Sequence, residues 1–127
     1  MNEPRDNIIV SKSYSFALKV IELYKYLISE KKEYVMSKQL LRCGTSIGAN
    51  VHEAVASESK KDFIHKLGIA LKEARETSYW LRLLKETNYI SQDQASELHS
   101  ACEELIKILN SIILTTKGRY FQNIDNS

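Results

Sequence analysis

Apolar residues recur every three or four positions along most of this chain, with polar residues between them. In the first such stretch, residues 11–31, the repeating positions are Phe16, Val20, Leu23 and Leu27. That step places side chains on one face of an α-helix. The pattern therefore predicts a first helix over about 11–31, with Ser11 or Ser13 as its N-cap.

Three more stretches carry the same period, and we predict helices over about 37–58, 60–87 and 91–117. Each has a polar residue suited to capping its first turn. These starts are Ser37, Ser59 with Asp62, and Ser91 with Gln94. Gly118 suits the position after the last helix. Four helices with short connections predict an all-α, antiparallel up-down-up-down bundle over 11–117, with flexible ends at 1–10 and 118–127.

The second predicted helix contains two glycines, Gly44 and Gly48, among other small residues. An interior glycine costs a helix roughly 1 kcal/mol relative to alanine. Two such residues indicate that a neighbouring helix backbone approaches closely at this point.

Composition is ordinary for a globular domain, with 127 residues, 43% of them hydrophobic and 27% charged, and a net charge of +2. The charge is unevenly spread, however. Residues 60–87 hold seven Lys or Arg against four Asp or Glu, whereas 91–116 hold one against four. Local charge determines which partners a surface attracts. We therefore look for a basic surface on the third helix.

Signatures of enzymes and cofactors are missing from the sequence. His52-Glu53 opens like a zinc-protease motif, but Ala56 stands where the second histidine is required. We predict no catalytic residue, no metal site and no cofactor. Cys43 and Cys102 fall in apolar helical patterns, where burial is favoured over reactivity. With no signal peptide and no membrane-spanning run, we expect a cytoplasmic protein.

Three polar residues of the second helix share a face next to its apolar positions: Ser46, Asn50 and Glu53. We interpret them as a buried polar network that fixes the helix register, with Arg75 available to pair with Glu53. A catalytic reading would need a nucleophile or an acid–base pair beside them, and the sequence provides neither.

The third helix carries the best functional signal. Projected at 100° per residue, six side chains form one stripe without an acidic residue before Glu86. They are Lys61, His65, Lys72, Arg75, Tyr79 and Arg82. Lys38 and Arg42 on the second helix add nearby positive charge. Such a stripe can contact phosphates and stack a base. The alternative is a solvated face with pairs such as Lys72–Glu76.

A second row on the same helix contains Ile69, Trp80 and Leu83. A four-helix bundle buries one face of each helix, so this extra apolar row predicts a homo-oligomer interface. The alternative is a tryptophan that lies flat over a neighbouring helix.

The stretch from Gln39 to Leu84 also resembles a known family. Its pattern is Gln39-Leu40, Arg42, Ser46-Ile47, Ala49-Asn50 and Glu53, followed by Asp62-Phe63-Ile64, Leu67, Ile69-Ala70, Glu73, Glu76 and Leu81. It resembles the four-helix-bundle proteins encoded within intervening sequences of bacterial 23S rRNA genes. The accessory proteins of diversity-generating retroelements look like the same family.

The resemblance implies a ring-like homopentamer with a basic surface that binds nucleic acid, and no catalytic residues. Its retroelement relatives imply RNA and a reverse transcriptase as partners. We therefore predict a non-enzymatic oligomer that offers a basic surface to RNA or DNA. The alternative is a protein-interaction scaffold without direct nucleic-acid binding.

Overall fold

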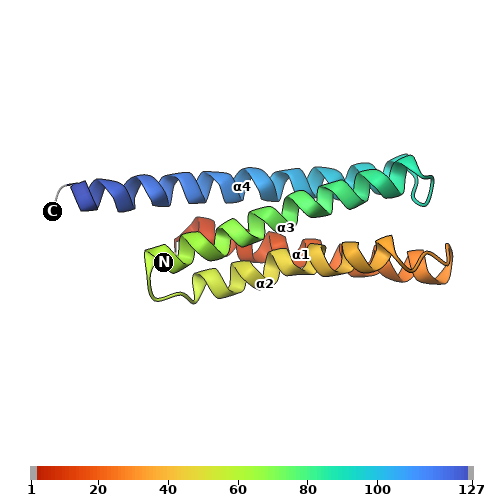
Figure 1. The fold of residues 1–127 in the computed structure, drawn as a ribbon, viewed down its shortest axis with the longest axis horizontal. Coiled ribbons are helices and arrows are strands. Elements are labelled where there is room, and N and C mark those ends of the chain that lie inside the picture. Colours follow the sequence, from red (N-terminus) through yellow and green to blue (C-terminus); the bar gives the residue numbers. More distant parts are fainter. Residues whose placement is uncertain (1–2, 126–127) are drawn as a thin grey trace.

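Four long antiparallel helices form the molecule (Figure 1). The computed structural model describes residues 3–125, and the side chains of residues 3–120. The helices are α1 (Pro4–Ser29), α2 (Met36–Val55), α3 (Lys60–Glu86) and α4 (Gln92–Asp125). All regular structure in the described part of the chain is helical. The predicted all-α, up-down-up-down bundle is confirmed.

The predicted apolar positions line one continuous core. Phe16, Val20 and Leu27 from α1 are almost fully buried, as are Leu67 on α3 and Leu105 on α4. Successive helices pack closely against each other, whereas the contact between α1 and α4 is the least extensive of the four helix–helix contacts. The bundle is therefore more open along the seam between its first and last helices.

Two predicted caps are confirmed. Ser59 Oγ accepts a hydrogen bond from Asp62 N at 3.1 Å. Ser91 and Gln94 form the reciprocal capping box, with Ser91 N to Gln94 Oε1 at 2.8 Å and Gln94 N to Ser91 Oγ at 3.1 Å. Both caps depend on residues three apart, so the local sequence contains all the information required.

The cap of α2 differs from the prediction. Ser37 lies inside the helix, and its hydroxyl donates to the carbonyl of Glu33 at 2.7 Å. The buried Glu33 carboxylate accepts instead from the backbone N–H groups of Val35, Met36 and Ser37 at 2.8–3.1 Å. A single side chain outside the helix thus satisfies three N–H groups at its start.

The predicted flexible N-terminus at 1–10 is wrong for the described residues, because α1 begins at Pro4. Proline is favoured in the first helical turn, and Asp6 Oδ2 accepts from Glu3 N at 3.1 Å. The buried Ile9 extends the apolar face by two turns. The serines at 11 and 13 are therefore interior residues and not caps.

The predicted tail at 118–127 is also wrong through residue 125, because α4 continues to Asp125. Gly118 does not have a positive φ, so it does not terminate the helix. One interior glycine costs about 1 kcal/mol, which a long helix tolerates. Arg119 Nη1 contacts Glu3 Oε1 at 2.9 Å, and Arg5 Nη2 reaches Thr116 Oγ1 at 3.5 Å. The last turns of α4 then extend past the other helices (Figure 1).

The small residues of α2 do allow a close approach. At Gly48 an added Cβ would lie 3.4 Å from the backbone oxygen of Ser13, which is ordinary contact. At Gly44 it would lie 2.8 Å from Val20 Cγ1. Gly44 therefore makes room for the Val20 side chain and not for a neighbouring backbone, whereas position 48 would accept an alanine.

Candidate nucleic-acid interface

The predicted basic stripe lies on the outward face of α3. All six of its side chains are exposed, and we call them the basic row: Lys61, His65, Lys72, Arg75, Tyr79 and Arg82. The helix buries the opposite face through residues such as Leu67 and Leu81. At 1.5 Å per residue the row is about 30 Å long. That length spans several phosphates of a nucleic-acid backbone.

Most cations of the basic row form no ion pair in the described structure. Arg82 Nε lies 3.4 Å from Glu86 Oε2 in an exposed pair. Within the described part of the chain, Lys61, Lys72 and Arg75 form no ion pair within 4.0 Å. Exposed pairs contribute little free energy and exchange readily. The row therefore keeps its positive charge available to a ligand.

Arg42 occupies a different environment from the one predicted. Its guanidinium lies 2.9 Å from Glu73 Oε2 and also contacts the Glu76 carboxylate, which joins α2 to α3. The hydrogen bond that Arg42 donates to Glu76 raises the pKa of the guanidinium. With two carboxylates as partners, Arg42 is largely neutralised and fits poorly as a phosphate contact. Lys38 is exposed on the same helix.

Trp80 is anchored within its own protomer. Its indole Nε1 donates to Glu76 Oε2 at 3.1 Å, and its ring meets Tyr79 edge to face with centroids 5.2 Å apart. The hydrogen bonds from Arg42 and then Trp80 lower the pKa of Glu76. Trp80 is half-buried, as are Ile69 and Leu83. The apolar row of Ile69, Trp80 and Leu83 is thus partly covered by its own bundle and partly exposed at the surface.

The predicted buried polar network is wrong. Ser46 Oγ donates to the carbonyl of Arg42 at 2.6 Å, and Asn50 Nδ2 donates to the carbonyl of Ser46 at 2.8 Å. Glu53 is exposed and pairs with Lys66 at 3.8 Å, not with Arg75. Ser46 and Asn50 bond to their own helix backbone, a local alternative that competes with contacts to other helices.

Both cysteines are buried free thiols. Cys102 Sγ donates to the carbonyl of Ala74 at 3.1 Å, and burial raises the pKa of its thiol to about 12. Burial also raises the pKa of Cys43. A thiolate is the reactive form of cysteine, so these environments do not suit nucleophilic chemistry.

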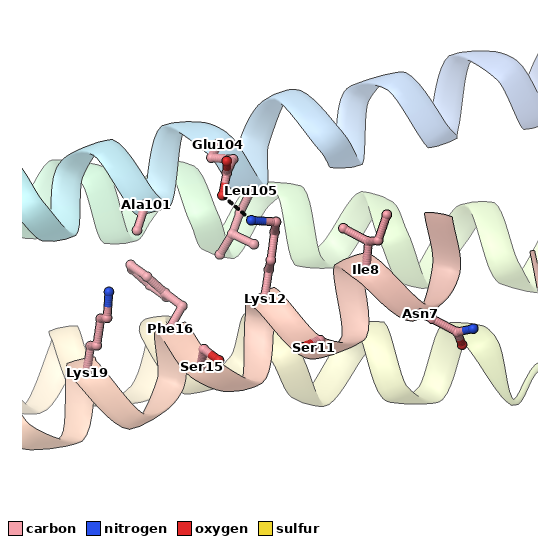
Figure 2. Close-up of a pocket in the computed structure, with 10 residues that line it drawn as sticks. All are labelled: Asn7, Ile8, Ser11, Lys12, Ser15, Phe16, Lys19, Ala101, Glu104 and Leu105. Carbon is pink, nitrogen blue, oxygen red and sulfur yellow. Dashed lines mark hydrogen bonds and ion pairs between the residues drawn. The ribbon is translucent and has the colours of Figure 1, made fainter. Parts of the chain in front are cut away.

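The sequence reasoning missed a groove along the open seam between α1 and α4. Its main cavity is about 550 Å³ and is lined by Ile8, Phe16, Ala101 and Leu105, among others. Figure 2 shows Phe16 pointing toward α4 and Lys12 reaching across to Glu104, with Nζ and Oε1 3.0 Å apart.

A second ion pair crosses the same seam, from Lys19 Nζ to Glu97 Oε1 at 3.4 Å. The two lysines and the two glutamates are each seven residues apart. Heptad-spaced opposite charges on two helices are a recognisable signal for antiparallel neighbours. The sequence therefore held a clue to this seam.

The described residues hold no group of three or more His, Cys, Asp or Glu side chains arranged to bind a metal ion. None of the helices in the described part of the chain is long and apolar enough to cross a membrane.

Comparison with known proteins gives two matches and one negative result. The family model for the 23S rRNA-intervening sequence protein matches residues 5–111. A solved structure from Bacteroides thetaiotaomicron VPI-5482, described as a protein with unknown function from the S23 ribosomal protein family, is 53% identical. The match covers 86% of this chain and 97% of that one, with a TM-score of 0.85. No curated protein matches this chain at a comparable level. Since the family model spans most of the bundle, this chain belongs to the 23S rRNA-intervening sequence protein family.

Proposed function

We propose that this protein is a non-enzymatic homo-oligomer, a pentamer, that presents a basic surface to RNA or DNA. The observation that carries the proposal is the basic row, where Lys61, Lys72 and Arg75 are exposed along about 20 Å of α3 without an ion pair in the described structure. A row of cations on a rigid helix binds phosphates by releasing counterions. Tyr79, with 57% of its surface exposed, offers a ring for base stacking.

Filter binding to a structured RNA at 50 and 200 mM salt tests the proposal. If three cations contact phosphates, affinity should fall roughly fortyfold between the two salt concentrations. The variant with Lys61, Lys72 and Arg82 all changed to Glu should lose binding at the lower salt. Arg75 stays unchanged, so that the variant alters only three positions.

A matched control carries the same change in net charge elsewhere. Lys31, Lys107 and Lys117 are exposed and lie outside the basic row. Changing these three residues to Glu should leave most of the affinity in place. Absence of binding by the wild type at 50 mM salt would contradict the proposal, and so would equal losses in the two triple variants.

A second candidate function is supported by the groove between α1 and α4. Ile8 and Leu18, which line cavities between α1 and α4, are 48% and 50% exposed and add apolar surface to this seam. The protein would then act as an interaction scaffold, with a protein partner such as a reverse transcriptase. Its mark would be a partner that stays bound after nuclease treatment and is lost when Leu18 is changed to Glu.

A further inference from the structure

A smaller pocket lies between α3 and α4, at the end of the basic row. It has a volume of about 230 Å³, and we call it the α3–α4 pocket. Its lining includes Arg82 and Lys85 from α3 and Gln92, Ser96 and His99 from α4. Arg82 belongs both to the pocket and to the basic row. The pocket therefore lies where a strand following the row would arrive.

Several polar groups of the pocket can donate hydrogen bonds, and Arg82 and Lys85 can only donate. Gln92 Nε2 donates to Ser96 Oγ at 2.9 Å, which leaves the Ser96 hydroxyl hydrogen free to donate elsewhere. His99 Nε2 lies 3.2 Å from Ser78 Oγ and 3.7 Å from Glu103 Oε1, so one nitrogen of the imidazole is positioned by these two neighbours. Arginine, lysine and hydroxyl donors together suit the oxygens of a phosphate group.

One carboxylate, Glu86, also lines the pocket and pairs with Arg82 at 3.4 Å. The two side chains are 75% and 56% exposed. An exposed pair of this kind exchanges readily for a stronger anionic partner. The first turn of α4 adds the positive end of a helix dipole beside Gln92.

The volume and charge of the α3–α4 pocket restrict the chemical class of ligand that it can bind. Pockets for drug-sized molecules usually exceed about 300 Å³, so this one accommodates a phosphate group with little more. A phosphomonoester carries about −1.5 to −2 at pH 7, more than the single charge of a phosphodiester. With two cations against the one carboxylate of Glu86, the lining stays positive, and a dianion is attracted to it more strongly than a monoanion.

We propose that the α3–α4 pocket binds a terminal phosphate, the phosphomonoester at the end of a nucleic-acid strand that follows the basic row. This inference rests on the proposed function for its source of phosphate. The shared chemistry, a phosphate dianion, also occurs in free inorganic phosphate and in the phosphomonoesters of small metabolites.

The test compares three single-stranded RNA oligonucleotides of one sequence, with a 5′-phosphate, a 3′-phosphate or no terminal phosphate. One phosphorylated strand should bind about tenfold more tightly than the unphosphorylated strand. Lys85→Gln should abolish that tenfold difference, because Lys85 lines the pocket and lies outside the basic row. Lys107→Gln, an exposed lysine outside the pocket, should preserve it.

Broadening of the ³¹P signal of inorganic phosphate provides a readout that does not need RNA. Equal affinity for all three strands would contradict the proposal that the α3–α4 pocket binds a terminal phosphate. It would not contradict the proposal that the basic row binds nucleic acid. If neither these strands nor the structured RNA binds, but wild-type protein broadens the phosphate signal and Lys85→Gln does not, the site takes free phosphate and the proposed function fails. Absence of both effects overturns both proposals.

Discussion

At the scale of single residues, Gly44 and Val20 set how closely α1 and α2 pack. Gly44→Ala would place a methyl group 2.8–2.9 Å from both γ carbons of Val20, a side chain with no exposed surface. Overpacking of this kind costs about 1–3 kcal/mol, against less than 1 kcal/mol gained in helix propensity. We expect a net loss of about 1–2 kcal/mol in the free energy of unfolding, measured by urea denaturation.

Gly68 provides the matched control, because an added Cβ there meets nothing within 4 Å. Gly68→Ala lies on the outward face of α3 and should stabilise the protein by about 0.5–1 kcal/mol. Combining Gly44→Ala with Val20→Ala should cost less than the sum of the two single changes. Equal effects at both glycines would show that contact with Val20 is not what limits position 44.

The Glu76 carboxylate gives the fold a pH dependence. The Arg42 and Trp80 hydrogen bonds lower its pKa below the ordinary value of 4.5. A carboxyl group with a lowered folded-state pKa stabilises the protein above its unfolded-state pKa. That stabilisation is lost as the pH falls through the folded-state value.

The corresponding prediction concerns Glu76→Gln. Its stability deficit relative to wild type should be present at pH 7 and shrink below about pH 4. Because Arg42 and Glu76 are partly exposed, the deficit should stay near or below about 1 kcal/mol. Urea denaturation at pH 7, 5 and 3.5 measures it. Glu97→Gln, at an exposed ion pair, should show a smaller deficit, and a Glu76→Gln deficit that does not vary with pH would refute the argument.

At the scale of elements, the start of α2 depends on one side chain. Glu33 is buried and its carboxylate accepts three backbone N–H groups. Glu33→Ala should destabilise the protein by about 1–2 kcal/mol, because those donors would lose their partner. Glu58→Ala, at an exposed position in the next interhelical connection, should change stability by less than about 0.5 kcal/mol. Thermal unfolding followed by circular dichroism distinguishes the two variants.

Helix existence and type could be predicted from the sequence, and helix ends only in part. The starts of α3 and α4 follow from caps three residues apart, which are visible in the chain. The Glu33 cap could not be foreseen, because it requires a turn in which Lys32 has a φ of 53°. The early start of α1 did have a local signal, Pro4 in its first turn and a cap between Glu3 and Asp6, which the prediction overlooked. Burial of Ile9 in the core is the tertiary contribution, and local propensity alone does not reveal it.

At the scale of the whole molecule, Trp80 tests self-association. It is half-buried on its own protomer, and its remaining surface is available to a second copy. Trp80→Glu should reduce the mass measured by multi-angle light scattering, because a charge there is costly to bury in an interface. Trp80→Phe should keep the assembly. A wild-type protein that stays monomeric at high micromolar concentration would refute the interface.

The candidate site could be predicted as a pattern, and not as a set of contacts. Exposure of the basic row follows from its position opposite the apolar face, which the sequence shows. The neutralisation of Arg42 does not, because Glu73 and Glu76 lie on another helix, more than thirty positions away. Likewise, the side chains of Ser46 and Asn50 donate hydrogen bonds to backbone carbonyls of their own helix. Residue spacing alone cannot show whether such a side chain bonds within its helix or to another helix.

The contact between Arg119 and Glu3 suggests how the order of the helices along the chain can be changed by circular permutation. Because the beginning of α1 meets the later part of α4, a linker of about six to eight residues could join the two ends. New termini could then be opened in the turn at 87–91, at the opposite end of the bundle. Such a circular permutant should keep the native packing while moving both chain ends to the other pole of the molecule.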